Sequence, residues 1–158
     1  RKGSRIGNLY GRTPADSRAL VARDSLLPHD VPVVVIVDRR TGAGAEIVAA
    51  ALQDHGRALV IGEKTAGAGT IQIVLPLPAN EGALVVTSAR VHRANGARLE
   101  GAGVTPQLLI DAATGKMSLR ADVAADFNAD MAERLRAALA SAPANSDPAL
   151  LAALTALK

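Results

Sequence analysis

The apolar positions of this chain follow two different periods, and the change between them divides the sequence. Residues 31–37 and 58–61 are almost continuously apolar and rich in β-branched side chains, which is typical of strands covered on both faces. Between them, apolar residues at helical spacing over residues 46–54 predict an amphipathic helix. A strand, a helix and a strand within about thirty residues indicate a right-handed parallel unit. The pattern predicts an α/β core in which residues 31–37 form a central strand.

The remaining pattern predicts elements on either side of this unit. Residues 5–12 can form a short strand, and Thr13, Pro14 and Asp16 have the spacing of a helix N-terminus, which predicts a helix to about residue 24. From residue 70 the runs 71–77 and 83–89 flank a turn and predict a β-hairpin. Residues 107–110 predict another strand. Beyond residue 115 the pattern is helical, with helices expected over 119–140 and over 147–158.

Composition narrows the functional classes. The chain has 158 residues with a formal charge of +3, and its only aromatic side chains are Tyr10 and Phe127, so surfaces on which nucleic-acid bases could stack are missing. Its 18 basic residues are scattered, and we expect no nucleic-acid partner. It has no cysteine, and its three histidines lack helical pairing, so we expect no metal site and no cofactor. No membrane span or signal peptide is visible, and the first residue is Arg, which suggests a piece of a longer polypeptide.

Two turns of small residues follow the two predicted strands of the parallel unit. The first is Thr41-Gly-Ala-Gly-Ala-Glu-Ile47, which opens the helix, and the second is Thr65-Ala-Gly-Ala-Gly-Thr-Ile-Gln72. In α/β sheets, functional sites form where the carboxyl ends of neighbouring strands meet. We therefore expect a site between these turns, although methyl groups occupy the positions where a nucleophile and a base would stand.

Several short motifs follow one another along the chain, at residues 33–47, 52–63, 65–72, 75–78, 87–90, 95–96, 101–106 and 147–154. In this order they closely resemble the C-terminal processing peptidases, also called tail-specific proteases. The resemblance implies a ClpP/crotonase-like α/β core with a mixed sheet, β-hairpins and a C-terminal helical segment. It divides the chain into a partial peptidase-like core over residues 1–118, without the family's usual PDZ domain, and C-terminal helices over 119–158 that pack on the core. It also points to the bacterial periplasm or cell envelope.

The family resemblance assigns roles to positions in the two turns. The family uses a serine at the helix start and a lysine 25 residues later, because a serine hydroxyl needs a base to take its proton and a buried lysine can serve as that base. Alignment on the motifs places Ala43 at the nucleophile position and Ala68 at the lysine position, while Gln72 matches the third catalytic residue. The flanking glycines are the expected binding residues: Gly42, Gly44, Gly67 and Gly69.

Three interpretations stay open. In the first, the chain is a catalytically degenerate domain that binds a polypeptide or a small apolar ligand, because alanine can neither attack nor accept a proton. In the second, it is a serine-type endopeptidase whose alanines are substitutions. In the third, other residues act, with Thr41 and Lys64 as candidates, although a hydrogen-bonding threonine and a solvated lysine explain both residues more simply. A homo-oligomer is compatible with all three.

Overall fold

The computed structural model describes residues 1–24, 28, 31–78, 81–111, 113–114, 116–120, 137 and 147–156. In these residues the strands form two sheets of four strands each. The first sheet is antiparallel, with the order β2-β1-β6-β5. Its strands are β1 (Arg5–Gly11), β2 (Arg18–Val21), β5 (Thr70–Pro76) and β6 (Ala83–Arg93).

The second sheet is mixed, with the order β3-β4-β7-β8. The first three strands run parallel and the last is antiparallel to its neighbour, so the predicted mixed sheet is confirmed. Its strands are β3 (Val34–Val37), β4 (Leu59–Gly62), β7 (Leu108–Ile110) and β8 (Met117–Leu119). The helices whose bounds are described are α1 (Gly44–Asp54) and α3 (Pro148–Ala156), and the 3-10 turn η1 spans Pro14–Asp16.

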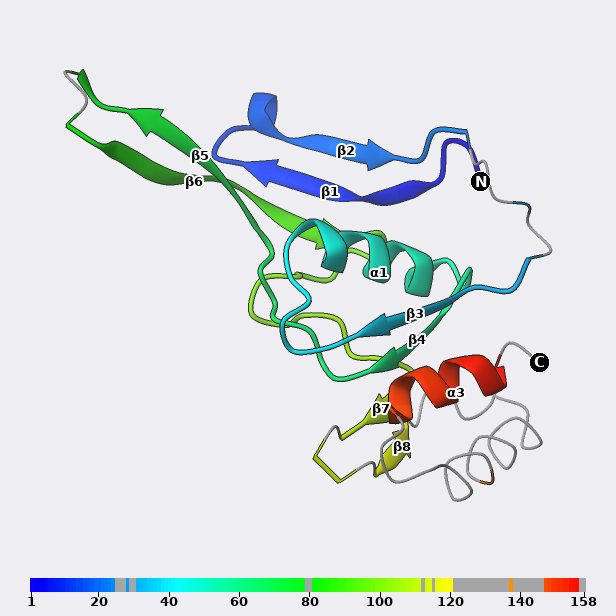
Figure 1. Ribbon diagram of the computed structural model, residues 1–158. Helices are drawn as coiled ribbons and strands as arrows, with labels where there is room; N and C mark the ends of the chain where they lie inside the picture. Colours follow the sequence, from blue (N-terminus) through cyan, green and yellow to red (C-terminus); the bar gives the residue numbers. More distant parts are fainter. Residues whose placement is uncertain are drawn as a thin grey trace.

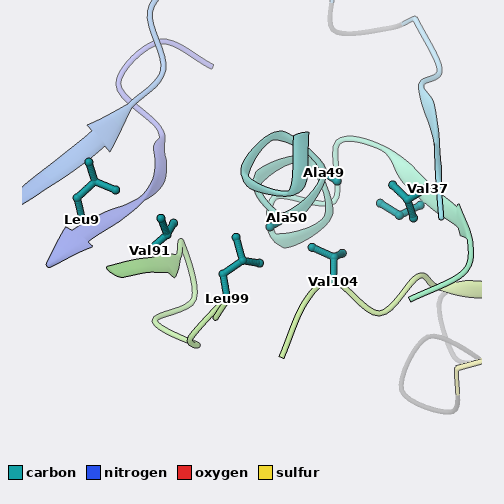
Figure 2. Close-up of a cluster of buried hydrophobic side chains, with 8 residues drawn as sticks. Leu9, Val37, Ala49, Ala50, Val91, Leu99 and Val104 are labelled. Carbon is teal, nitrogen blue, oxygen red and sulfur yellow. The ribbon is translucent and has the colours of Figure 1, made fainter. Parts of the chain in front are cut away.

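The two sheets and two helices stack in alternating layers (Figure 1). Helix α1 lies between the sheets, and α3 covers the far face of the mixed sheet. Figure 2 shows the inner cluster, in which aliphatic side chains from both sheets meet the alanines of α1. Its buried members are Leu9, Val37, Ala49, Ala50, Val60, Val91, Leu99 and Val104. Because alanine is short, it lets the helix backbone approach both sheets closely.

The predicted parallel unit and hairpin are both confirmed. Strands β3 and β4, which precede and follow α1 in the chain, pair in parallel. This pairing places the two small-residue turns at the same edge of the mixed sheet. Strands β5 and β6 form the hairpin, and its turn end extends away from the rest of the described chain (Figure 1). The predicted C-terminal helix is also confirmed as α3.

The helix predicted over residues 13–24 is wrong. Its start signal is real, because the Thr13 backbone N–H donates to the Asp16 carboxylate at 3.2 Å, but only the one turn of η1 follows. Ser17 then leaves the helical conformation, and the chain pairs antiparallel with β1 as β2. The cap residues report how a turn begins, whereas the long-range pairing decides whether a helix continues.

Two further sequence predictions need correction. In the described strand order, β3 lies at an end of the mixed sheet and not at its centre, and Ile36 is 46% exposed. A continuous apolar run predicts that both faces of a strand are covered, whereas only Val37 of β3 is buried, and such a run carries no information about the strand's hydrogen-bonding edges. The helical pattern predicted beyond residue 115 is wrong for Met117–Leu119, which pair with β7. The helices predicted over 119–140 fall almost wholly outside the described residues.

A buried polar network ties α1 to both sheets. The Arg93 guanidinium donates to both Asp54 carboxylate oxygens, at 2.6 and 3.3 Å, and to the Gln53 side-chain oxygen at 2.7 Å. Gln53 in turn donates to the backbone oxygen of Thr105 and to Gln107. This network fixes the C-terminal end of α1. No described helix is long and apolar enough to cross a membrane.

Candidate functional site

The two small-residue turns lie side by side at the carboxyl ends of β3 and β4. The backbone N–H of Ala66 donates to the backbone oxygen of Thr41 at 2.9 Å and joins one turn to the other. A Cβ placed on Gly42 would lie 3.5 Å from the Ala68 methyl carbon and 3.7 Å from that of Ala66. The structure therefore brings the turn that contains Ala43 into contact with the turn that contains Ala68.

Ala43 enters α1 through an unusual backbone conformation. It has φ 52° and ψ −121°, and among the described non-glycine residues it alone has a positive φ. Such a conformation costs an L-residue about 1–3 kcal/mol and is typical of sharp turns that expose one side chain between a strand and a helix. Ala43, Gly44 and Ala45 are all exposed, so this turn presents its side chain to solvent at the N-terminus of the helix.

Glu46, in the first turn of α1, holds the two turns together. Its side chain is fully buried and accepts four hydrogen bonds. One oxygen accepts from the Thr65 hydroxyl and from the backbone N–H of Gly67 at 2.6 Å. The other accepts from the backbone N–H of Ala68 at 2.7 Å and from that of Ala43 at 3.1 Å. A carboxylate with acceptor capacity on both oxygens suits this set of donors, so Glu46 fixes the position of Ala68 relative to Ala43.

A third segment, residues 99–104, supports the second turn from the other side. The Thr65 hydroxyl accepts from the Val104 backbone N–H at 2.7 Å, and the Gly101 backbone N–H donates to Gly67 at 2.9 Å. Gly69 packs so closely on this segment that a Cβ there would lie 2.1 Å from a backbone nitrogen. Gly69 therefore makes a close approach that no larger residue allows. The Gly-Ala-Gly-Val-Thr-Pro motif thus stabilises the second turn through its backbone.

The structure does not join Thr41, Lys64 or Gln72 to Ala43 in one site. The Thr41 hydroxyl donates to the Asp38 carboxylate at 2.9 Å, and this hydrogen bond is the main reason why the pKa of Asp38 is lowered. Lys64 is exposed. Gln72 is exposed on β5, where an irregularity in the pairing between Ile71 and Gln72 shifts the register against β6. Irregularities of this kind commonly re-aim a side chain beside a site.

An ion pair and a hollow with acidic lining residues lie beside Thr41, where the first small-residue turn begins. Arg39 donates to the Glu63 carboxylate at 2.7 Å, and this pair lowers the pKa of Glu63 and raises that of Arg39. A hollow of about 400 Å³ lies nearby between the ends of β3, β4 and β7 and the start of α3, and Asp38, Glu63 and Asp147 are among its lining residues. In the described part of the chain, no three His, Asp or Glu side chains lie close enough together to hold a metal ion.

Sequence reasoning missed the roles of Glu46 and Thr65. An acid in the first turn of a helix is ordinarily explained by the helix dipole and needs no further partner, so the sequence pattern assigns Glu46 no other role. One signal was present: an acid three residues after the helix entry, followed about twenty residues later by a threonine and two glycines, all within otherwise small-residue turns. Only the fold shows that these groups meet.

The family model of peptidase family S41 matches residues 6–110. This chain belongs to peptidase family S41. The resemblance to the C-terminal processing peptidases is therefore confirmed, and the curated relatives have matching names. The carboxy-terminal-processing protease of Bartonella bacilliformis is 36% identical over 106 residues, which cover 67% of this chain and 24% of that protein. The carboxyl-terminal-processing protease of Picosynechococcus sp. is 49% identical over 61 residues, which cover 39% of this chain and 14% of that protein.

The S41 chain described here thus spans a quarter or less of the length of these two relatives. A solved structure from Bacteroides fragilis, described as an S41 protease, superposes with a TM-score of 0.56 over 72% of this chain and 31% of its own, at 18% identity. That likeness supports the fold. The expected peptidase-like α/β fold is confirmed.

Proposed function

We propose that this S41 chain is a catalytically degenerate peptidase core that binds polypeptide without cutting it. The observation that carries the proposal is the pair of methyl groups at the two turns. Ala43 stands at the strained entry to α1, and Ala68 lies on the turn that contacts it. An alanine supplies neither a nucleophile nor a base, so the usual acyl transfer of a serine peptidase has no first step at these positions.

Binding remains possible because the backbone part of the site does not depend on those side chains. The first turn of α1 is exposed, and the positive end of the helix dipole favours an anionic group beside it, although the N–H groups of Ala43 and Ala45 already donate to Glu46 and to the Gly42 oxygen. A polypeptide carboxyl terminus would fit that preference, and the surrounding methyl groups and glycines suit an apolar side chain. We therefore favour a polypeptide end as the ligand over a small polar molecule.

A second candidate is a working serine peptidase in which the alanines replace a natural serine and lysine. The strained backbone of Ala43 favours it, because alanine gains nothing from φ 52° whereas a nucleophile would be lifted toward a substrate. The third interpretation, an enzyme that uses other residues such as Thr41 or Lys64, has less support. The Thr41 hydroxyl is already held by Asp38, so a change of rotamer would break that hydrogen bond.

The test is cleavage of an unfolded protein with a labelled C-terminus by the complete natural polypeptide that contains this chain. The variants are Ala43→Ser, Ala68→Lys and the double variant, with Ala45→Ser as a control that adds a hydroxyl two residues further along the chain. We expect cleavage by the double variant alone and binding of the labelled C-terminus by the parent. Cleavage by the unmodified protein would refute degeneracy. Absence of both cleavage and binding in every form would refute the proposed function altogether.

A further inference from the structure

Asn95 and Gly96 are exposed and lie in the turn directly after β6. The Gly96 backbone N–H donates to the Arg93 oxygen at 3.0 Å, and the Arg93 N–H donates to the Ala97 oxygen at 2.8 Å, so residues 93–97 make a tight reversal. Gly96 has φ 89°, a conformation that favours glycine, and a Cβ added there would meet nothing within 4 Å. The turn is therefore both tight and open to solvent.

The sequence at this turn has a chemical reactivity of its own. Of the five asparagines in the chain, Asn95 alone precedes a glycine. The backbone nitrogen that follows an asparagine can attack the side-chain amide, and glycine favours this attack because it has no side chain to hinder it. The Asn95 side-chain oxygen accepts from the Ala97 N–H at 2.9 Å, which polarises the amide carbon. Because exposed turns open at little cost in free energy, the Gly96 nitrogen can react without unfolding of the core.

We propose that Asn95 is a modification site that deamidates spontaneously, with water as the only co-reactant. The Gly96 nitrogen forms a bond to the Asn95 side-chain carbonyl carbon, and the side-chain nitrogen leaves as ammonia with the proton that Gly96 gives up. The product is a cyclic imide. Water then opens the imide at either carbonyl and leaves an aspartate at position 95, in the normal linkage or in the isoaspartyl linkage, in which the main chain runs through the side chain. Neither step oxidises or reduces any atom.

The modification acts on a buried ion pair, because Asn95 contacts one of its partners. The Asn95 amide nitrogen donates to the Asp54 carboxylate at 3.0 Å. Asp54 also accepts from Arg93 at 2.6 Å, and the Arg93 and Asp54 side chains are only 12% and 6% exposed. A carboxylate at position 95 has no N–H to donate and adds a second negative charge beside Asp54. Deamidation therefore replaces a hydrogen bond with repulsion at a place that salt and water screen poorly.

The isoaspartyl product has an additional effect on the backbone. It lengthens the main chain by an extra carbon inside the reversal of residues 93–97, and so shifts the backbone hydrogen bonds that close it. Both products act on the C-terminal end of α1, because Asp54 is the last residue of that helix. Deamidation of Asn95 thus loosens the contact between β6 and α1 as the protein ages. The inference does not depend on whether the candidate site cleaves polypeptide or only binds it.

The first test is incubation of the complete natural polypeptide at about pH 8 and about 37 °C for several weeks, followed by trypsin and mass spectrometry. We expect the tryptic peptide of residues 94–98 to gain about 1 Da and to separate into two chromatographic forms. The peptide of residues 6–12, in which Asn8 precedes a leucine, is the internal control and should stay unchanged. If Asn95 converts no faster than Asn8 in the native protein, Asn95 is not the proposed site.

Thermal melting tests the link to Asp54. Asn95→Asp mimics one product, and we expect its Tm to lie at least about 3 °C below that of the parent. Ala97→Asp adds the same charge to the turn at an exposed position and should lower the Tm by less than about 1 °C. Equal melting of these two variants would show that the added charge does not act through Asp54, and would overturn that part of the proposal.

A time course joins the two measurements. Asn95→Ser keeps a short side-chain acceptor for the Ala97 N–H but forms no imide, so its Tm should stay constant during the incubation. The Tm of the parent should fall in step with the mass gain of residues 94–98. A parent whose Tm stays constant while this peptide gains mass would show that deamidation leaves the contact between β6 and α1 intact, against the proposal.

Discussion

Replacing Glu46 should destabilise the whole core, although an acid in a first helical turn is ordinarily worth little. Glu46 is fully buried and accepts from Thr65, Gly67 and Ala68 across the two turns, as well as from Ala43. A surface acid at a helix start contributes about 0.3–1 kcal/mol through the dipole. The size of the stability loss therefore distinguishes two roles of Glu46: a surface acid that interacts only with the helix dipole, or a buried carboxylate that holds the two turns together.

The magnitude follows from the donors that Glu46→Ala leaves behind. A hydrogen bond to a charged group is worth about 1.5–3 kcal/mol, and a donor left buried without a partner costs about 1–3 kcal/mol. The Thr65 side chain is buried, with 5% of the residue exposed, so its hydroxyl cannot regain water, whereas Ala68 is exposed and its N–H can. The substitution also removes the desolvation cost of the buried carboxylate, which offsets part of the loss of stability. We expect a decrease in the free energy of unfolding of about 3–5 kcal/mol.

Urea denaturation followed by circular dichroism measures this change directly, and the midpoint temperature should fall by roughly 10 °C for a domain of this size. Glu46→Gln keeps one acceptor oxygen but turns an amide toward two N–H groups, so we expect about half the loss. Glu100→Ala removes a carboxylate from an exposed pair with Arg90 and should cost less than about 1 kcal/mol. A loss below about 1 kcal/mol for Glu46→Ala would refute the role assigned to the buried carboxylate.

Three other predictions test the backbone and the electrostatics of the two turns. Ala43→Gly should stabilise the protein by about 0.5–2 kcal/mol, because glycine tolerates the observed φ of 52°; a loss of stability on urea denaturation would contradict the strained geometry. Gly69→Ala should destabilise by about 3 kcal/mol or more, since its Cβ would lie 2.1 Å from a backbone nitrogen, whereas Gly44→Ala meets nothing within 4 Å and should be harmless. The pKa of Asp38 lies below its ordinary value of 3.8, so its contribution to stability is present above that value and is lost as pH falls through the lowered pKa. Thr41→Val removes the largest cause of the lowering, so the pKa of Asp38 should rise in an NMR titration, and an unchanged value would exclude that hydrogen bond as the cause.

The sequence by itself determined the elements whose pattern is local. The apolar runs and the helical spacing between them were sufficient for β3, α1 and β4, and two alternating runs around a turn were sufficient for the β5–β6 hairpin. The order of short motifs was sufficient for the family. These features succeed because periodicity reports which faces are buried, and because small residues mark turns wherever the backbone needs them.

Other features depended on partners far away in the chain. The helix start at Thr13 is followed by only one helical turn, because the next residues pair with β1 as strand β2. The apolar run of β3 was sufficient for the strand, but not for its burial, because Ile36 is exposed, nor for its place in the sheet, because the hydrogen-bonding edge of a strand leaves no mark in side-chain spacing.

The candidate site shows the same division. The turns around Ala43 and Ala68 could be found from small residues and spacing, but the hydrogen bonds that hold them together come from Glu46, whose donors lie about twenty residues away. A buried carboxylate is stable only where several donors converge on it, and that convergence is a property of the folded chain. The sequence thus determined which residue types meet at the site, and the tertiary structure decided how they are held.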